Sequence, residues 1–193
     1  MPSPSWSRCS GWINKQSREA SLARKKMVKL VFYLLYCCAA IKSCGLSRIL
    51  FKVMDQIEKF VKDSGLTIYA YNVCFYDSNG ADEILDNILC GKKRANTGLF
   101  SLFEAQMQLL PRKGDYTVVL DSDMQPRCIT RTTKVDVVPF EDVTAEWAAA
   151  EGDGTLAAWK KAHRKAFAAA CEEIGRNFDE SMKCVYEYFD VVY

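Results

Sequence analysis

From Met54 to the C-terminus, apolar residues recur at helix or strand spacing between regular turn signals. Ile57, Phe60 and Val61, for example, are spaced as i, i+3 and i+4, which is typical of a helix. The pattern predicts helices over 55–63, 81–90, 144–150 and 155–173, and strands over 67–75, 116–121, 127–138 and 183–192. Helices and strands are segregated rather than alternating as βαβ units. The chain is therefore expected to adopt an α+β fold with a mostly antiparallel sheet or a small barrel.

The N-terminal part of the chain has a different pattern. Residues 1–26 are rich in Ser and basic residues and lack apolar periodicity, so we expect them to be largely disordered. Residues 30–41 form a run of twelve apolar residues, which is too short to cross a bilayer as a helix. The segment resembles a leader, and residues 1–45 leave three roles open: no role or a non-native start, organelle targeting, and membrane association.

Charge and composition separate the same two parts. Residues 1–53 hold ten Lys and Arg residues and one acid, whereas residues 54–193 hold 16 basic and 23 acidic residues. Such an asymmetry is typical of a tail joined to a domain of different character. The chain contains 49% hydrophobic residues and only five prolines, which excludes collagen-like and wholly disordered classes. We therefore expect a basic leader over 1–53 and one domain over 54–193, with its core at 66–193.

The nine cysteines do not indicate a metal site. Their number is odd, no C-x-x-C motif occurs, and His163 is the one histidine of the chain. Free thiols among apolar residues favour a reducing compartment, so we expect a cytoplasmic protein without metal or cofactor.

Three consecutive cations, Lys92, Lys93 and Arg94, follow Gly91 at the end of a predicted helix and lead into a predicted loop. In an otherwise acidic domain, such a cluster suits an anionic partner such as a phosphate or a nucleic-acid backbone. The alternative is a solvated cluster that complements the dipole at a helix C-terminus.

Six sequence blocks that keep their order and approximate spacing carry a family resemblance. The blocks lie at 88–97, 113–115, 129–135, 139–143 and 147–154, and the last holds Leu156, Trp159 and His163. Over roughly 66–193 the chain resembles the ASCH domain (activating signal cointegrator homology), a relative of the PUA fold. The resemblance implies a small, mostly antiparallel β-barrel flanked by helices, with a cleft for RNA or a modified nucleoside or nucleotide. Protein partners in an RNA-related complex are also possible, and no signature of sequence-specific DNA binding is found.

A subset of bacterial family members resembles this chain around the cleft and hydrolyses the acetyl amide of N-acetylated cytidine, without a metal. Their Lys and Thr lie in G-x-K-x-x-T, and a Glu follows further along. Gly91, Lys93 and Glu151 match this set, whereas Asn96 stands at the Thr position. The resemblance thus implies Lys93 as base and Glu151 as proton relay, with Asn96 as a hydrogen-bond donor. Thr97 is one residue late, and in an extended segment we expect it to point to the opposite face.

Other candidates could contact the ligand. Arg131 lies on a predicted strand, where it could bind a phosphate or remain a surface residue. Trp159 and His163 share one helix face, which is typical of core packing but could also provide a stacking surface and a polar contact. The candidate ligand-binding residues are Lys92, Arg94, Thr97, Arg131, Trp159 and His163.

These residues leave the function open between classes. With an amide at the Thr position, we expect an RNA- or nucleoside-binding protein first. The alternatives are an amidohydrolase in which Lys93 and Glu151 activate water, and a ribonuclease. Lys93 and Glu151 could equally form a structural ion pair.

Overall fold

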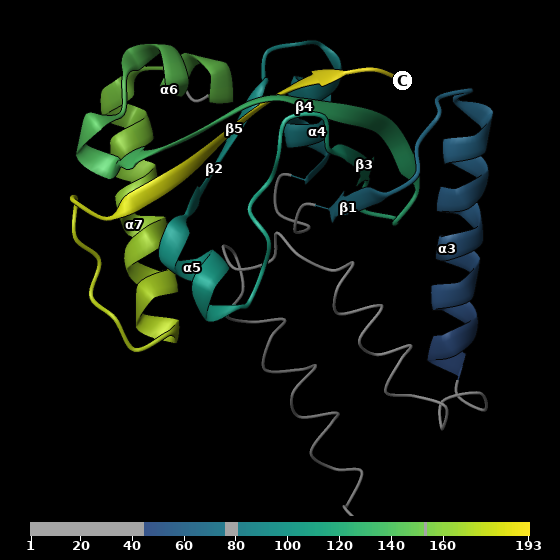
Figure 1. Ribbon diagram of the computed structural model, residues 1–193, viewed down its shortest axis with the longest axis horizontal. Coiled ribbons are helices and arrows are strands. Elements are labelled where there is room, and N and C mark those ends of the chain that lie inside the picture. Colours follow the sequence, from purple (N-terminus) through teal and green to yellow (C-terminus); the bar gives the residue numbers. More distant parts are fainter. Residues whose placement is uncertain (1–44, 76–80, 153) are drawn as a thin grey trace, which may run out of the picture.

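The computed structural model describes residues 45–75, 81–152 and 154–193 (Figure 1). The expectations for residues 1–26 and for the leader up to residue 44 lie outside this part of the chain. The elements in chain order are α3 (Gly45–Asp63), β1 (Tyr71–Phe75), α4 (Ala81–Leu89), β2 (Ala95–Leu99), α5 (Phe100–Ala105), β3 (Tyr116–Leu120), β4 (Pro126–Pro139), the short 3-10 helix η1 (Phe140–Asp142), α6 (Ala145–Glu151), α7 (Leu156–Glu173) and β5 (Lys183–Val191). None of these helices is long and apolar enough to cross a membrane.

The five strands form one mixed sheet in the order β1-β3-β4-β5-β2. The β1–β3 pair is parallel and the other three pairs are antiparallel, so the predicted α+β fold is confirmed. Strand β4 pairs with β3 on one side and with β5 on the other, and it carries a register shift between Thr132 and Lys134. The long strands β4 and β5 run side by side across the molecule (Figure 1). Among the described residues no pairing joins the edge strands β1 and β2. The pairings therefore do not close the sheet into the expected barrel.

Helices cover both faces of the β1-β3-β4 half of the sheet. Neighbouring residues of a strand point to opposite faces, and Val118 and Val119 of β3 show this alternation. Val118 packs with Ile57 of α3, whereas Val119 packs with Ile88 of α4. The apolar spacing that predicted these two helices therefore corresponds to their buried sides.

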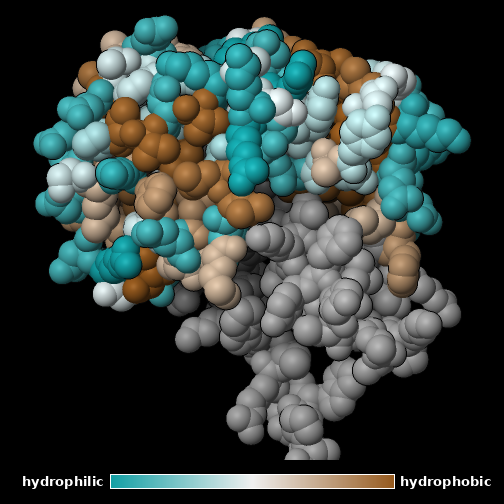
Figure 2. Space-filling model, viewed as in Figure 1, coloured by the Kyte–Doolittle hydropathy of each residue, from teal (hydrophilic) through white to brown (hydrophobic). Residues whose placement is uncertain are grey.

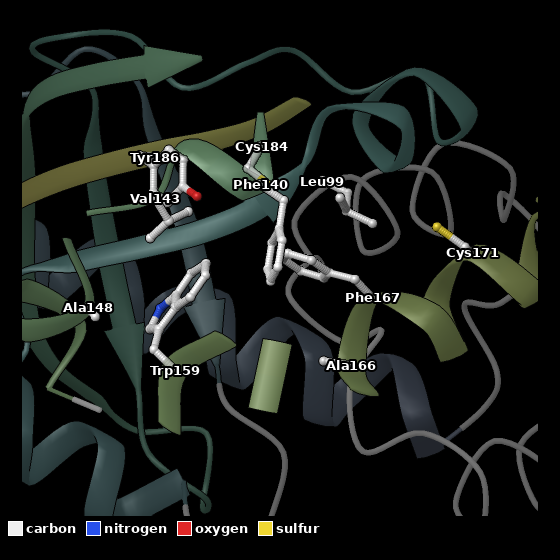
Figure 3. Packing of buried hydrophobic residues seen from close by; sticks show 10 residues of the cluster. All are labelled: Leu99, Phe140, Val143, Ala148, Trp159, Ala166, Phe167, Cys171, Cys184 and Tyr186. Carbon is white, nitrogen blue, oxygen red and sulfur yellow. The ribbon is translucent and has the colours of Figure 1, made fainter. Parts of the chain in front are cut away.

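A third hydrophobic cluster joins α5, α6 and α7 to β2 and β5. Trp159, Tyr186 and Phe140 are its largest fully buried side chains. Figure 3 shows Trp159 between Phe140 and Ala148 of α6, with its indole nitrogen on the side of α6. On the surface, by contrast, apolar residues form separate patches among hydrophilic ones (Figure 2). The buried cluster around Trp159 fixes the position of α6 against the sheet.

Two predicted threonine caps start the helices of this cluster. Thr144 accepts a hydrogen bond from the Trp147 amide, and Thr155 accepts one from the Ala158 amide. Helix α6 ends at Gly152, whose φ of 84° suits glycine. A Cβ atom there would lie 3.4 Å from the carbonyl oxygen of Lys92, so the glycine also allows this close approach.

Three elements were missed from the sequence: β2, α5 and the short helix η1. Strand β2 lies where a loop was expected after the basic cluster, and α5 follows it directly. Helix α3 starts at Gly45 and runs across residues 53 and 54, where the sequence predicts the start of the domain. The division into leader and domain stays a prediction.

Candidate functional site

The backbone around Lys93 joins the end of α4 to the end of α6. After α4 the chain turns at Gly91, whose φ is 84°. The Lys93 amide then donates to the carbonyl of Asn87 at 2.8 Å, and the Arg94 amide donates to the carbonyl of Ala150 at 2.6 Å. These bonds bring the side chain of Lys93 to the last residue of α6.

Lys93 and Glu151 meet in a buried ion pair. The Nζ atom of Lys93 lies 3.3 Å from Oε2 of Glu151 and 3.4 Å from the carbonyl oxygen of the same residue. The two residues are 8% and 5% exposed, so both charges are largely removed from water. The structure thus brings together the lysine and the carboxylate that the resemblance implied. Burying such a pair usually costs stability, because both charges lose their hydration.

Thr97 belongs to the buried cluster of Lys93 and Glu151, whereas Asn96 does not. The Thr97 hydroxyl donates a hydrogen bond to Oε1 of Glu151. Along β2, buried residues alternate with half-buried ones, and Ala95, Thr97 and Leu99 are the buried set. The expectation that Thr97 points away from Lys93 and Glu151 is wrong, because the alternation places Asn96 on the opposite face.

Trp159 holds the same carboxylate from α7. Its indole Nε1–H donates to Oε1 of Glu151 at 3.1 Å. Its side chain is fully buried, so it cannot present a surface on which a base stacks, and the packing alternative applies. His163 stacks on its ring at a centroid distance of 3.9 Å and places Nε2 3.7 Å from Oε2 of Glu151.

Strand β5 brings to the site three side chains that stay neutral at ordinary pH, those of Cys184, Tyr186 and Tyr188. Burial raises the pKa of the Cys184 thiol to about 12, and the negative charge of Glu151 acts in the same direction. Burial also raises the pKa of Tyr188 to about 12 and that of Tyr186 well above its usual range. The charged contacts of Glu151 therefore come from Lys93 and, when protonated, from His163.

A pocket of about 380 Å³ lies between β4, α6 and β5. It is lined by Thr133, Lys134, Thr144, Glu146, Trp147 and Tyr188. Trp147 precedes Glu151 by four residues on α6, so the two share a helix face. Its ring stacks on Tyr186 at 4.4 Å, and Tyr186 pairs with Thr97 across β2 and β5. Trp147 therefore belongs to the wall of the pocket and also packs against the strands that carry the cluster.

Sequence reasoning missed the residues of this pocket. Sequence spacing could have indicated some of them. Trp147 lies one helical turn before Glu151, and Tyr186 and Tyr188 lie two residues apart on one face of the last strand. Lys134 Nζ lies 5.5 Å from the ring centroid of Tyr188 and pairs with Asp136 at 2.5 Å, and Glu146 also lines the pocket. The pocket edge therefore carries charges of both signs.

The remaining predicted residues lie outside the cluster. Lys92 is exposed, and the Arg94 guanidinium folds over Gly91. Arg131 is exposed above the ring of Tyr116, at 5.6 Å from the ring centroid. Arg131 and Thr97 pair with β5 at positions four residues apart, or about 13 Å along the strand. The structure therefore does not bring Arg131 to Lys93.

Metal ligands were also sought within the part of the chain that the structure describes. No group of three or more His, Cys, Asp or Glu side chains is placed there to hold a metal ion.

The sequence pattern of the ASCH domain matches residues 71–193, which is most of the chain. The chain belongs to the ASCH domain family. This PUA-like family assignment confirms the resemblance found in the sequence. A comparison with curated proteins finds no match.

Solved structures agree with the family. The crystal structure of an ASCH domain from Lactobacillus crispatus JV V101 is 32% identical with a TM-score of 0.66, covering 73% of this chain and 94% of that one. Protein EF3133 from Enterococcus faecalis V583, of the DUF984 family, is 27% identical with a TM-score of 0.66, covering 74% of this chain and 88% of that one. The match thus spans most of each of these two bacterial chains.

Proposed function

We propose that this ASCH domain protein binds a nucleoside in the pocket beside Trp147 and hydrolyses an acyl amide on its base. N-acetylated cytidine is the proposed substrate class. The observation that carries the proposal is the convergence of Lys93, Thr97 and Glu151 in one buried cluster. These are the residue types that the hydrolytic family subset uses, with Thr97 in place of the residue expected from sequence spacing.

The contacts support a nucleophilic role for Thr97. Its hydroxyl already donates to Glu151, so the proton can move to the carboxylate as Oγ1 attacks the acyl carbon. Glu151, which Lys93 contacts at 3.3 Å, relays the proton between the hydroxyl, the lysine and the leaving amine. The C–N bond then breaks, and the amino group of the base departs with the proton. Water then adds to the acyl-threonine. One of its protons returns to Oγ1, the other is released to solvent, and the acyl group leaves as a carboxylate.

The pocket beside Trp147 has the chemistry of a nucleoside site. Its volume of about 380 Å³ lies in the usual range for small-ligand sites. Trp147 and Tyr188 offer aromatic surface for a base, and Lys134 offers a cation for a phosphate. Because Trp147 and Glu151 share a face of α6, a base held at Trp147 can direct an exocyclic amide toward the cluster.

RNA binding without cleavage is a second candidate function. The observation that favours it is the exposure of two lysines: Lys92, beside the end of α6, and Lys134, which lines the pocket and pairs with Asp136. Exposed cations of this kind bind the backbone of single-stranded RNA without reading its sequence. Ribonuclease action, the other enzyme alternative, would appear as cleavage of the same RNA.

Acetate release from N-acetylated cytidine tests the proposal. The wild-type protein should release acetate, and Lys93→Ala should lower the rate by about 100-fold or more, because a buried acid–base group is lost. Lys92→Ala is the matched control, since the neighbouring lysine is exposed and should keep the activity. If the wild-type protein binds the nucleoside but releases no acetate at high protein concentration, the hydrolase proposal is wrong and binding alone remains.

A further inference from the structure

The hydrogen bond between His163 and a backbone carbonyl indicates which ring nitrogen carries a proton in the neutral form. Nδ1 lies 3.1 Å from the carbonyl oxygen of Trp159. A carbonyl oxygen can only accept, so Nδ1 must be the donor. In the neutral ring, Nε2 then has a lone pair and no proton. That lone pair faces Oε2 of Glu151 at 3.7 Å, so the neutral ring is repelled by the ionised carboxylate.

We propose that His163 is a positioning residue of this site, which binds Glu151 through Nε2 only when that nitrogen is protonated. The net charge of the site then changes with pH in the neutral range, where histidine titrates. In the imidazolium form, His163 and Lys93 both contact Oε2 and hold the carboxylate. In the neutral form, the carboxylate loses one donor and is more available to accept the proton of Thr97.

The surroundings of the ring leave few other groups that could produce this effect. Glu151 faces it from α6, and Lys93 approaches the same carboxylate from the segment before β2. From β5, Cys184, Tyr186 and Tyr188 stay neutral because burial raises the pKa of each of them. On α7 itself, Trp159 and Phe167 pack against the ring.

Of the charged neighbours of His163 on α7, Lys161 and Lys165 are exposed to solvent, and the other two have partners. Lys160 donates to the carbonyl of Glu141, and Arg164 pairs with Glu180. Glu151 is therefore the acid whose charge should control the protonation of the ring. The inference concerns the same site as the proposed function, and it rests on that site's carboxylate rather than on the reaction.

Nuclear magnetic resonance of the ligand-free full chain tests the inference, because His163 is the one histidine of the sequence. Long-range ¹H–¹⁵N spectra from pH 5 to 9 should show that Nδ1 stays protonated while Nε2 titrates. In Glu151→Gln the titration midpoint should fall by about one pH unit or more, because the facing negative charge is gone. Glu172→Gln, which removes an exposed carboxylate from the same helix, should leave the midpoint unchanged.

Two results would overturn the inference. One is a neutral ring protonated at Nε2 instead of Nδ1, which the wild-type chain reveals even if Glu151→Gln does not fold. The other is an equal midpoint in the wild-type chain and Glu151→Gln. Neither result depends on acetate release. A protein that releases no acetate would therefore contradict the hydrolase proposal without affecting this inference.

Discussion

The hydroxyl of Thr97 donates a hydrogen bond to the carboxylate of Glu151, 54 residues further along the chain. This bond joins an edge strand, β2, to the last residue of α6. It also decides which residue of the basic segment takes part in the site, because Asn96 lies on the other face of β2. In the proposed reaction, the nucleophilic oxygen is therefore that of Thr97.

Thr97→Val should abolish acetate release, because it replaces the hydroxyl with a methyl group of similar size. Asn96→Ala should retain the activity, since its side chain points away from Glu151. Initial rates with N-acetylated cytidine at saturating substrate measure both effects. If Asn96→Ala is inactive while Thr97→Val is active, the assignment made from the geometry of β2 is reversed.

The sequence predicted the elements that carry a strong periodic pattern. Helix α7 and strand β5 were expected within one or two residues of their observed bounds, because their apolar residues repeat at clear periods. Strand β2 has no such pattern: it contains an amide, a hydroxyl and a glycine among five residues. Its strand conformation comes from pairing with β5, which a local pattern cannot reveal.

The candidate site was predicted in part for the same reason. The family resemblance implied Lys93 and Glu151, and the structure brings them together. The choice between Asn96 and Thr97 depended on where β2 begins, and one residue in a strand changes the face. Trp159 shares a helix face with His163, but only the packing against Phe140 shows that its ring is fully buried.

Glu151→Ala should destabilise the folded protein by about 3–5 kcal/mol, because it leaves the buried Lys93 cation without its partner. The Thr97 hydroxyl and the Trp159 indole N–H would lose their shared acceptor as well. Urea unfolding followed by circular dichroism measures the change. Glu180→Ala is the control, since its pair with Arg164 lies on the surface and should matter little. Equal effects of the two variants would show that the buried cluster contributes nothing to stability.

The protein should lose stability above about pH 9. Burial raises the pKa of Cys184 to about 12 and that of Cys128 to about 11, from a value of 9.0 in the unfolded chain. Between these values the unfolded chain binds fewer protons than the folded one, so stability falls as pH rises. The contribution is fully present below pH 9 and is lost as the pH passes through the folded values.

Urea midpoints at intervals from pH 7 to pH 11 check this dependence. Cys184→Val should flatten the decline, because it removes a buried ionisable group and keeps an apolar side chain. Cys90→Val should follow the wild-type curve, since Cys90 is exposed. A wild-type midpoint that stays constant up to pH 11 would contradict the expectation.

Trp147→Ala should weaken binding of cytidine nucleotides by about 1–3 kcal/mol, the usual contribution of stacking one base on an aromatic ring. Because the same ring packs on Tyr186, Trp147→Phe is needed beside it and should restore much of the affinity. Fluorescence or calorimetric titration measures both, and Tyr69→Ala serves as control because Tyr69 is 96% exposed and does not line the pocket.

With a short single-stranded RNA, the logarithm of the affinity should fall by about 0.7 per tenfold rise in salt for each phosphate contact. Lys134→Ala should lower this salt dependence by the amount of one phosphate contact. Trp147→Ala should leave it unchanged, because stacking on the ring involves no charge. A salt dependence that Trp147→Ala lowers and Lys134→Ala leaves unchanged would mean that the RNA binds elsewhere on the domain.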